Sequence, residues 1–468
     1  MKLVYNVNDR PPVAKIIVFA LQQLLAILAA TILVPMIVGN GMSTSAALFG
    51  AGAGTIIYLL FTKFRSPVFL GSSFAFIGSM CAAFAGGVSA SAGYLGIIIG
   101  AVLAGLVYVI IALVIKFVGT GWISKIMPPQ VVGPTVAIIG LSLAANAIKD
   151  AVGGNLGFTV YDNNLTAWIM TTGGFVSLIC ALVTFVTIVI ASVHGNKTMK
   201  LIPFIIGIGA GYVVAALFTV FGYHIGGNAE FKIINFALFA DMKWLPDFAF
   251  LRVFTEGELS FGINGNFWSF LGTIAVAYVP VAFVVFAEHL ADHKNLSTII
   301  EKDLTADPGL DKTLLGDGVG SMVGAFFGGC PNTTYGESVG CVAISKNASI
   351  VTIFTTAIMA MVVSFIAPIQ TLLASIPSPV MGGACIALYG FIAVSGLKMI
   401  QKVDLEDNAN LFAVSSILIL GVGGMALQIG AIKLTSVACA LILGIVINAI
   451  VSKKFSCKKC ADKEADAE

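Results

Sequence analysis

Long apolar runs recur along this sequence from one end to the other. Stretches such as 16–38, 93–117 and 268–291 hold about 20 or more residues with very few charges, which is the length that crosses the hydrocarbon core of a bilayer. The 468 residues are 58% hydrophobic and 10% charged, with a mean hydropathy of +1.00. Soluble domains carry roughly 25% charged residues. The sequence therefore predicts an all-α polytopic membrane protein.

Fourteen transmembrane segments are predicted. Their ranges are 16–38, 45–62, 69–84, 93–117, 131–148, 166–191, 201–222, 268–291, 312–328, 331–345, 349–372, 379–397, 409–427 and 431–451. Segments three and ten are short and rich in Gly, Ser or Pro, so we expect them to be broken rather than plain spanning helices. The first run is too long for the apolar region of a cleaved signal peptide and has no small-residue cleavage pattern behind it.

The basic residues indicate the orientation. With the N-terminus in the cytoplasm, 20 of the 25 Lys and Arg residues fall in cytoplasmic segments and 5 outside. The positive-inside rule favours this topology in the cytoplasmic (plasma) membrane. The predicted division is a cytoplasmic N-terminus 1–15, a first seven-segment repeat 16–222, an extracellular loop 223–267, a second repeat 268–451 and a cytoplasmic tail 452–468.

Two pairs of motifs indicate the repeat. "PPQVVGPTVAIIGLSL" resembles "PSPVMGGACIALYGFI", with Gly133 aligned to Gly382 at an offset of 249. The broken segments also pair, "SSFAF" from Ser72 with "TYGES" from Thr334, at an offset of 262. Seven segments per half make the second half inverted relative to the first. Inverted repeats with broken helices in matching positions point to a transport site near the membrane midplane.

Acids within the predicted segments are few. Glu288 lies in "VVFAEHLADHKN" and Glu337 lies in "CPNTTYGESVG". A buried acid at membrane depth is costly unless it faces a cavity, finds hydrogen-bond donors or binds a proton. Asp292 follows Glu288 by one helical turn on the same face, while His289 and His293 lie about 100° and 140° away from Glu288. Two neighbouring carboxylates favour proton uptake, so this face suits proton exchange. The alternatives are a helix-end role for Glu288 and a capping role for Glu337.

The broken segments supply other groups that a ligand can use. Irregular backbone at membrane depth is tolerated where it lines a cavity or is buried in protein. Its free amides donate to carbonyl oxygens, carboxylates accept from N–H groups, and aromatic rings stack on flat molecules. Together these groups suit a small planar molecule with alternating N–H and C=O groups, and a nucleobase is one such molecule.

At these residues the sequence resembles a known family. "AEHLADH" followed by "DPGLDKTLLGDGVGSMVGAFFGGCPNTTYGESVG", with "QQLLAILAATILVP" and "GSSFAFI", looks like the nucleobase–ascorbate transporter family in its bacterial uracil permease branch. The resemblance covers about residues 10 to 455. It implies fourteen spans in two inverted repeats, a core and a gate domain, and short antiparallel strands in segments three and ten. It also implies proton-coupled transport, and a homodimer is among the expected assemblies.

The resemblance implies which positions of this chain form the site. The substrate acids fall on Glu288 and Glu337, and the proton-coupling positions are these two acids with Asp292 and His293. The strand amides fall on Phe74 and Gly336, and the pocket-shaping positions fall on Tyr335, Tyr389 and Ala30. Ala30 and Glu288, 258 apart, are also repeat equivalents.

Two positions depart from the uracil pattern. Uracil members carry His four residues after the first acid and purine members carry Asp, and this chain has Asp292. The second acid is Glu in uracil members and Gln in purine members, followed by Asn, whereas here Ser338 follows Glu337. We weight Glu337 more, because this residue is expected to touch the base.

The predicted function is proton-coupled uracil import. The partners are uracil or a related nucleobase, a proton and membrane lipid; no nucleic acid, cofactor or metal is expected. The alternatives are a xanthine or purine symporter of the same family and, with less support, an anion exchanger or channel of similar architecture. An exchanger would be expected to offer a positive site rather than two acids. The sequence shows no H-E-x-x-H motif and no nucleophile arrangement, so an enzyme is not expected.

Overall fold

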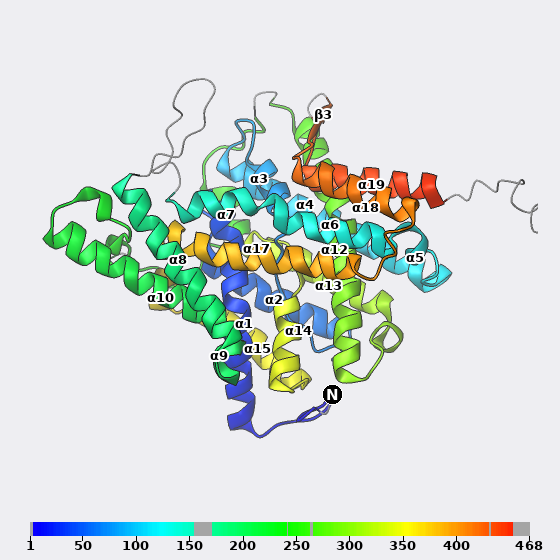
Figure 1. The fold of residues 1–468 in the computed structure, drawn as a ribbon, viewed down its shortest axis with the longest axis horizontal. Coiled ribbons are helices and arrows are strands. Elements are labelled where there is room, and N and C mark those ends of the chain that lie inside the picture. Colours follow the sequence, from blue (N-terminus) through cyan, green and yellow to red (C-terminus); the bar gives the residue numbers. More distant parts are fainter. Residues whose placement is uncertain (1–2, 154–170, 241, 263–264, 430–431, 453–468) are drawn as a thin grey trace, which may run out of the picture.

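The computed structural model describes residues 3–153, 171–240, 242–262, 265–429 and 432–452. The chain is mostly helical (Figure 1). The helices of the first half are α1 (Val13–Val38), α2 (Thr44–Phe61), α3 (Ile77–Ala83), α4 (Ala90–Val118), α5 (Ile123–Ile126), α6 (Pro129–Ser142), α7 (Ala144–Ala151), α8 (Thr172–Val193), α9 (Lys197–Leu201) and α10 (Pro203–Leu217), with a π-helical turn η2 (Phe218–Ile225).

A connection with two short 3₁₀ turns and one helix leads to the second half. These elements are η3 (Ala229–Phe231), η4 (Phe236–Phe239) and α11 (Ala249–Thr255). The second half contains α12 (Phe267–Ile300), a π turn η5 (Thr305–Gly309), α13 (Leu310–Gly328), α14 (Gly336–Ser345), α15 (Ile350–Val363), α16 (Ala367–Ala374), α17 (Ser378–Ile400), α18 (Asn408–Val422) and α19 (Ser436–Ser452).

Two pairs of short antiparallel strands complete the structure. β1 (Leu70–Ser72) pairs with β2 (Asn332–Thr334), and β3 (Leu427–Ile429) pairs with β4 (Ile432–Leu434). The first pair comes from the broken segments three and ten, each of which continues as a short helix, α3 or α14. Broken segments in these two places are what the Gly, Ser and Pro content predicted.

Within the described residues, eight helices are long and apolar enough to cross a membrane. They are α1, α2, α4, α6 with α7, α8, α10 with η2, α12 and α17. The pair α15 and α16, bent by 83°, makes a ninth if it counts as one span. The other predicted segments correspond to β1–α3, α13, β2–α14, α18 and α19. The chain is therefore a multi-pass membrane protein, while the count of fourteen crossings stays a prediction.

Two predicted segments differ in extent from the helices. The segment 268–291 is a predicted span, and the helix α12 that contains it continues through Asp292 and Lys294 to Ile300. Helical backbone bonds do not require apolar side chains, so a helix can extend past the end of its apolar run. The segment 131–148 is divided at Leu143 into α6 and α7. The segments 166–191 and 431–451 begin at residues outside the described ranges.

The helices form two packed groups. In the first group, α2 packs on α13 and α15, α4 packs on α12 and α13, and α1 packs on α2, α14 and α15. In the second group, α17 packs on α6, α7 and α8, α8 packs on α10, and α18 packs on α6 and α19. Figure 1 shows α6 and α17 side by side, with α18 and α19 beside α6, and α1 steeply inclined to α17 in this view. We call these sets the first and second helix groups.

The contact between α2 and α13 depends on glycine. Four glycines of α13, at positions 316, 320, 324 and 328, recur every four residues and therefore lie on one face. A Cβ atom on Gly50 of α2 would lie 2.5 Å from the carbonyl oxygen of Gly324. A Cβ atom on Gly54 would lie 2.6 Å from the carbonyl oxygen of Gly320. Small residues let membrane helices approach backbone to backbone, and these two helices use that contact along their length.

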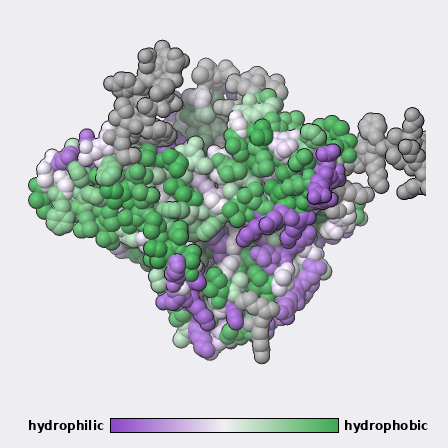
Figure 2. Space-filling view, in the orientation of Figure 1, coloured by the Kyte–Doolittle hydropathy of each residue, from purple (hydrophilic) through white to green (hydrophobic). Residues whose placement is uncertain are grey.

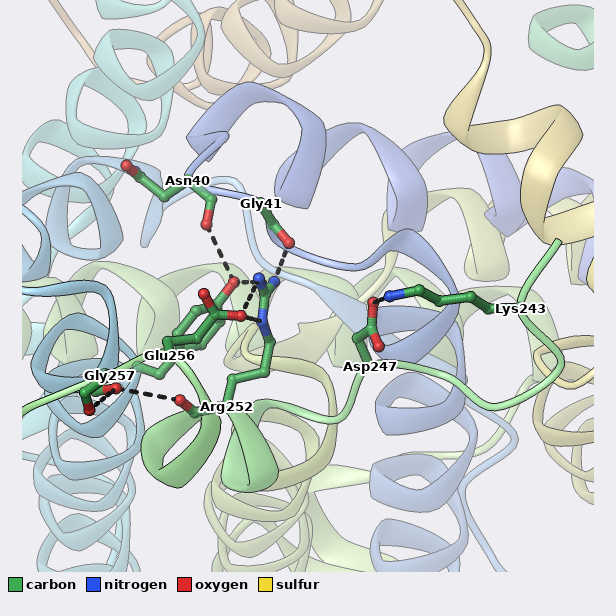
Figure 3. A network of polar contacts seen from close by, with 9 residues as sticks. Asn40, Gly41, Lys243, Asp247, Arg252, Glu256 and Gly257 are labelled. Atoms are coloured by element: carbon green, nitrogen blue, oxygen red, sulfur yellow. Dashed lines mark hydrogen bonds and ion pairs between the residues drawn. The ribbon is translucent and has the colours of Figure 1, made fainter. Parts of the chain in front are cut away.

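Arg252 on α11 bonds the loop between α1 and α2 and the beginning of α4. Its guanidinium pairs with Glu256 at 2.5 Å and donates to the carbonyl of Gly41 (Figure 3). The same group donates to the hydroxyl of Tyr94 at 2.5 Å and lies over that ring, 4.7 Å from its centroid. The Tyr94 hydroxyl donates in turn to the carbonyl of Asn40 at 3.2 Å. These contacts attach the connection between the two halves to the first helix group.

An ion-pair cluster stands at the turn between α12 and α13. Asp307 accepts from Lys302 at 2.8 Å and from Arg65 at 2.6 Å. Lys302 and then Arg65 lower the pKa of Asp307 to about 2. The three side chains are 39–51% exposed, so solvent screens the cluster and we assign no stability to it.

Much of the surface is apolar. Figure 2 shows hydrophobic side chains over the left part of the molecule, where α8 and α10 lie. Hydrophilic side chains form a band on the right of this view and gather around the lower end of the molecule. The exposed side chains on α8 include Phe175, Leu182, Val186, Val189 and Ile190. An apolar surface of this extent is expected where helices face lipid.

We predict that Gly50→Ala destabilises the protein by about 1–3 kcal/mol, because its methyl group would push α2 away from α13. The control is Gly272→Ala in α12, where a Cβ atom would meet nothing within 4 Å. The measurement is the temperature at which half of the detergent-purified protein stays monodisperse. Equal midpoints for Gly50→Ala and the wild type would contradict the close packing.

Candidate functional site

The two broken segments meet through their backbones. In the β1–β2 pair, Leu70 lies opposite Thr334 and Ser72 lies opposite Asn332. Because the strands are antiparallel, α3 follows one end of the ribbon and α14 follows the other. The ribbon therefore fixes where both short helices begin, and the sequence-predicted residues Phe74 and Glu337 lie just beyond it.

The backbone of Phe69 holds the turn that carries Glu337. Its carbonyl accepts from the amide of Tyr335 at 3.3 Å, and its amide donates to Oγ of Ser338 at 3.1 Å. Glu337 lies between these two attached residues, in the first turn of α14. Carboxylates are favoured there because the first amides of a helix lack acceptors within the helix. The amide of Gly336, the first residue of α14, is one of these groups.

Tyr335 packs across the ribbon. Its hydroxyl donates to the carbonyl of Ser72 at 2.8 Å, and the side chain is buried. The ring covers Gly71, where a Cβ atom would lie 2.3 Å from ring carbons. Only glycine leaves room for this ring, so Tyr335 and Gly71 together set the distance between the turn before α14 and β1.

The acidic face of α12 borders the same turn. Asp292 accepts from Oγ1 of Thr334 at 2.9 Å, and a Cβ atom on Gly336 would lie 3.8 Å from Asp292 Oδ1. Glu288 lies one turn earlier on the same face, and both acids are partly buried. Glu337 follows Gly336 directly in the first turn of α14, so it belongs to the turn that Asp292 borders. The structure therefore brings together the three acids that the sequence singled out.

The histidines lie on another face of α12, inside the first helix group. His293 Nε2 bonds the Tyr58 hydroxyl at 2.7 Å, and its Nδ1 bonds the carbonyl of His289 at 2.8 Å. His289 Nδ1 bonds Asp317 Oδ2 at 2.7 Å, and its Nε2 bonds Oγ1 of Thr313 at 3.1 Å. The two rings stack with centroids 4.0 Å apart. His293 is thus buried against α2, with both ring nitrogens occupied.

Sequence reasoning missed Asp317. This acid lies within the predicted segment 312–328, and its side chain is fully buried beside His289. An acid inside an apolar segment is the signal that could have found it. Its partner could not be read from the sequence, because the two residues lie on different helices.

The remaining predicted residues come from both helix groups. Phe74 follows β1, and its ring meets that of Tyr389 on α17 edge to face, with centroids 6.2 Å apart. No partner for the Phe74 amide is found among the described residues. Ala30 is buried on α1, which packs on β1, α3 and α14. Phe74 and Tyr389 therefore mark a contact between the first and second helix groups beside the ribbon.

A cavity of about 370 Å³ lies next to the acidic face of α12. Its walls come from α12, the α5–α6 region and the end of α17. The lining residues include Met127, Val132, Ala287, Ala291, Lys294 and Met399. Among the described residues, no cluster of three or more His, Cys, Asp or Glu side chains is placed to hold a metal ion. The arrangement is a set of acids, amides and aromatic rings, which suits hydrogen bonding to a planar ligand.

Solved structures share the fold. The transmembrane domain of a cyanobacterial bicarbonate transporter, BicA, superposes with a TM-score of 0.58 at 13% identity, covering 95% of this chain and 100% of that one. The murine anion transporter Slc26a9 in its inward-facing state gives a TM-score of 0.60 at 11% identity, covering 95% and 69%. At these identities the likeness concerns the fold alone.

Sequence relatives extend over nearly the full length. The uracil permease of Bacillus subtilis (strain 168) is 38% identical over 454 residues, covering 96% of this chain and 95% of that protein. The uracil permease of Escherichia coli (strain K12) is 32% identical over 466 residues, covering 99% and 97%. A profile described as the permease family matches residues 14–430. The chain therefore belongs to the permease family, the nucleobase–ascorbate transporters, as its motifs predicted.

Proposed function

We propose that the protein is a proton-coupled symporter that imports uracil across the cytoplasmic membrane. The observation that carries the proposal is the position of Glu337 in the first turn of α14, at the end of the β1–β2 ribbon and next to the acidic face of α12, in a chain similar over its length to proteins named uracil permeases. Two acids beside a ribbon with free backbone amides suit a neutral ligand that offers both N–H groups and carbonyl oxygens.

The proposed binding mode follows from the groups that uracil presents. Uracil has two N–H donors, which Glu288 and Glu337 accept, and two carbonyls, which amides at Phe74 and Gly336 can bind. Tyr335, Tyr389 and Ala30 then shape the walls of the pocket. A site that hydrogen-bonds each polar edge of its substrate rejects analogues that lack one of these groups.

Proton coupling is assigned to the acidic face of α12. Three carboxylates close together cannot all be ionised at low cost, so a proton bound at Glu288, Glu337 or Asp292 stabilises the loaded site. Asp292 also accepts from Thr334, which connects its charge to the end of β2. For His293, the bonds to Tyr58 and His289 favour a role in holding α12 against α2.

The proposed architecture is fourteen crossings in two inverted repeats, with both termini in the cytoplasm. Contacts between helices of the two halves support this architecture, because each contact below has a counterpart in which the two helices are replaced by their repeat equivalents. The contact of α1 with α15 has its counterpart in α12 with α4, and that of α8 with α17 in α18 with α6. The contact of α1 with α14 likewise matches α12 with α3. The first helix group is then the core domain and the second group the gate domain.

In this proposal, transport is a movement of the core domain against the gate domain. The cavity beside Ala287 and Ala291 lies between α12 of the core and α6 and α17 of the gate, with a residue of α5 also in its lining. Lys294 at its edge belongs to the cytoplasmic side under the proposed orientation. The cavity thus offers a route by which base and proton leave inward.

Uptake of labelled uracil tests the function. We expect vesicles with an inward proton gradient to accumulate uracil and a protonophore to abolish the accumulation. Uptake that continues at an equal rate with the protonophore would contradict symport.

The Glu288→Gln variant tests whether Glu288 accepts an N–H group of uracil. We expect its uracil affinity to fall by about 5- to 150-fold, which corresponds to an unmatched donor costing about 1–3 kcal/mol. The control is Glu406→Gln, an exposed acid in the turn before α18. Unchanged binding by purified Glu288→Gln would remove Glu288 from the site.

Competition between unlabelled bases tests whether the substrate is uracil or xanthine. Asp292 matches the purine members of the family, whereas Glu337 matches the uracil members. We expect unlabelled uracil to compete at least about tenfold better than xanthine, roughly 1.4 kcal/mol. Glu337→Gln should shift this ratio toward xanthine, because an amide both donates and accepts, while Asp292→His should change the pH profile more than the ratio. A wild-type preference for xanthine would make Asp292 the better marker and the uracil assignment wrong.

Cysteine labelling tests the orientation. In a background without native cysteines, Lys243→Cys should react with an impermeant reagent on intact cells, and Lys346→Cys should react only after permeabilisation. Both positions are exposed, so reactivity depends on the side of the membrane. Labelling of both from outside would contradict the proposed topology.

A further inference from the structure

Gln23 joins α1 to the turn that carries Glu337. Its side chain is buried, with 3% exposed, and Nε2 donates to Oγ of Ser338 at 2.6 Å. A longer contact of 3.4 Å runs from the same nitrogen to the carbonyl oxygen of Ser338. The two residues are 315 positions apart, so the bond joins the first transmembrane helix to α14 in the other half.

The hydroxyl of Ser338 accepts two hydrogen bonds. One comes from Gln23 and the other from the backbone amide of Phe69, just before β1. A serine oxygen has two lone pairs, so both are occupied. One atom therefore ties α1, α14 and the beginning of the ribbon together, one residue after Glu337.

The bond determines where the first turn of α14 lies. Ser338 is buried, so without the amide of Gln23 one of its lone pairs would face protein with no donor. Phe69 bonds both Tyr335 and Ser338, but Phe69 directly precedes β1, so these bonds fix the turn relative to the ribbon and not relative to α1. Gln23 therefore adds a hydrogen bond that fixes the position of this turn relative to α1.

We propose that Gln23 is a positioning residue for Glu337, acting through the hydroxyl of Ser338. It holds the first turn of α14 against β1 and α1, so that the carboxylate of Glu337 meets the N–H group of the base without rearrangement. The inference rests on the proposed uracil site. A residue in this role affects substrate affinity, whereas a residue that only stabilises the fold affects the amount of folded protein.

The test is equilibrium binding of labelled uracil to purified full-length protein, with thermal midpoints measured on the same samples. We expect Gln23→Leu and Ser338→Ala each to raise the Kd about tenfold, and the double variant to raise it by clearly less than the product, since the two residues share one bond. Ser338→Thr keeps the hydroxyl and should stay within about threefold. The matched control is Gln22→Leu, the same change one residue earlier on α1, with a Kd within about twofold.

A Kd for Gln23→Leu equal to that of the wild type would overturn the proposal. So would effects of Gln23→Leu and Ser338→Ala that multiply fully, or a rise as large in Gln22→Leu. A lowered midpoint with an unchanged Kd would leave Gln23 as a stabilising residue only and would also overturn it.

A second measurement does not depend on uracil. In a background without native cysteines, the thiol introduced by Glu337→Cys is alkylated with a small maleimide, with and without Gln23→Leu. We expect the alkylation rate to change at least about threefold when Gln23 is replaced, and equal rates would overturn the positioning role. Failure of the wild type to bind uracil would instead remove the proposed function, so the two failures are distinguishable.

Discussion

The structure depends on how the backbone hydrogen bonds of two broken segments are satisfied inside the protein. Both strands are buried, so each amide or carbonyl that lacks a helical partner needs one from elsewhere in the protein. The β1–β2 pair supplies most of these partners by joining the two segments to each other. Thr55 on α2 supplies more, because its hydroxyl accepts from the amide of Leu70 at 2.9 Å and donates to the carbonyl of Leu70 at 3.2 Å. The breaks are therefore tolerated only in this pairing.

The glycine contact between α2 and α13 serves the same ribbon. Asn332 in β2 donates to the carbonyl of Gly50 at 2.9 Å, and its side chain fills the space beside Gly54 and Gly324. A larger residue at either glycine would displace Asn332 as well as the facing helix. The close helix packing and the position of β2 are thus one constraint, which explains why a polar side chain is buried between two apolar helices.

The sequence was sufficient for the membrane-spanning class, the family and the two broken segments, because apolar length and Gly, Ser and Pro content are local properties. It also singled out Glu288 and Glu337, since charges in apolar runs are rare. It could not supply the strand register, the bond from Gln23 to Ser338 or the pairing of His289 with Asp317, because each joins residues far apart in the chain. The end of α12 at Ile300 could not be read from the apolar run either, because a helix can continue past its last apolar residue into polar sequence.

The site residues divide unequally between the two helix groups. Glu288, Asp292 and Glu337 all come from elements of the first group. The bond from Thr334 to Asp292, and the bonds by which Phe69 holds the turn around Glu337, stay within that group. The second group contributes Tyr389, through its ring contact with Phe74. If the groups move as bodies, as proposed, the acids and the ribbon keep their geometry while the aromatic contact opens or closes. Recognition of the base then belongs to the first group, and the exposure of the base to either side belongs to the interface between the groups.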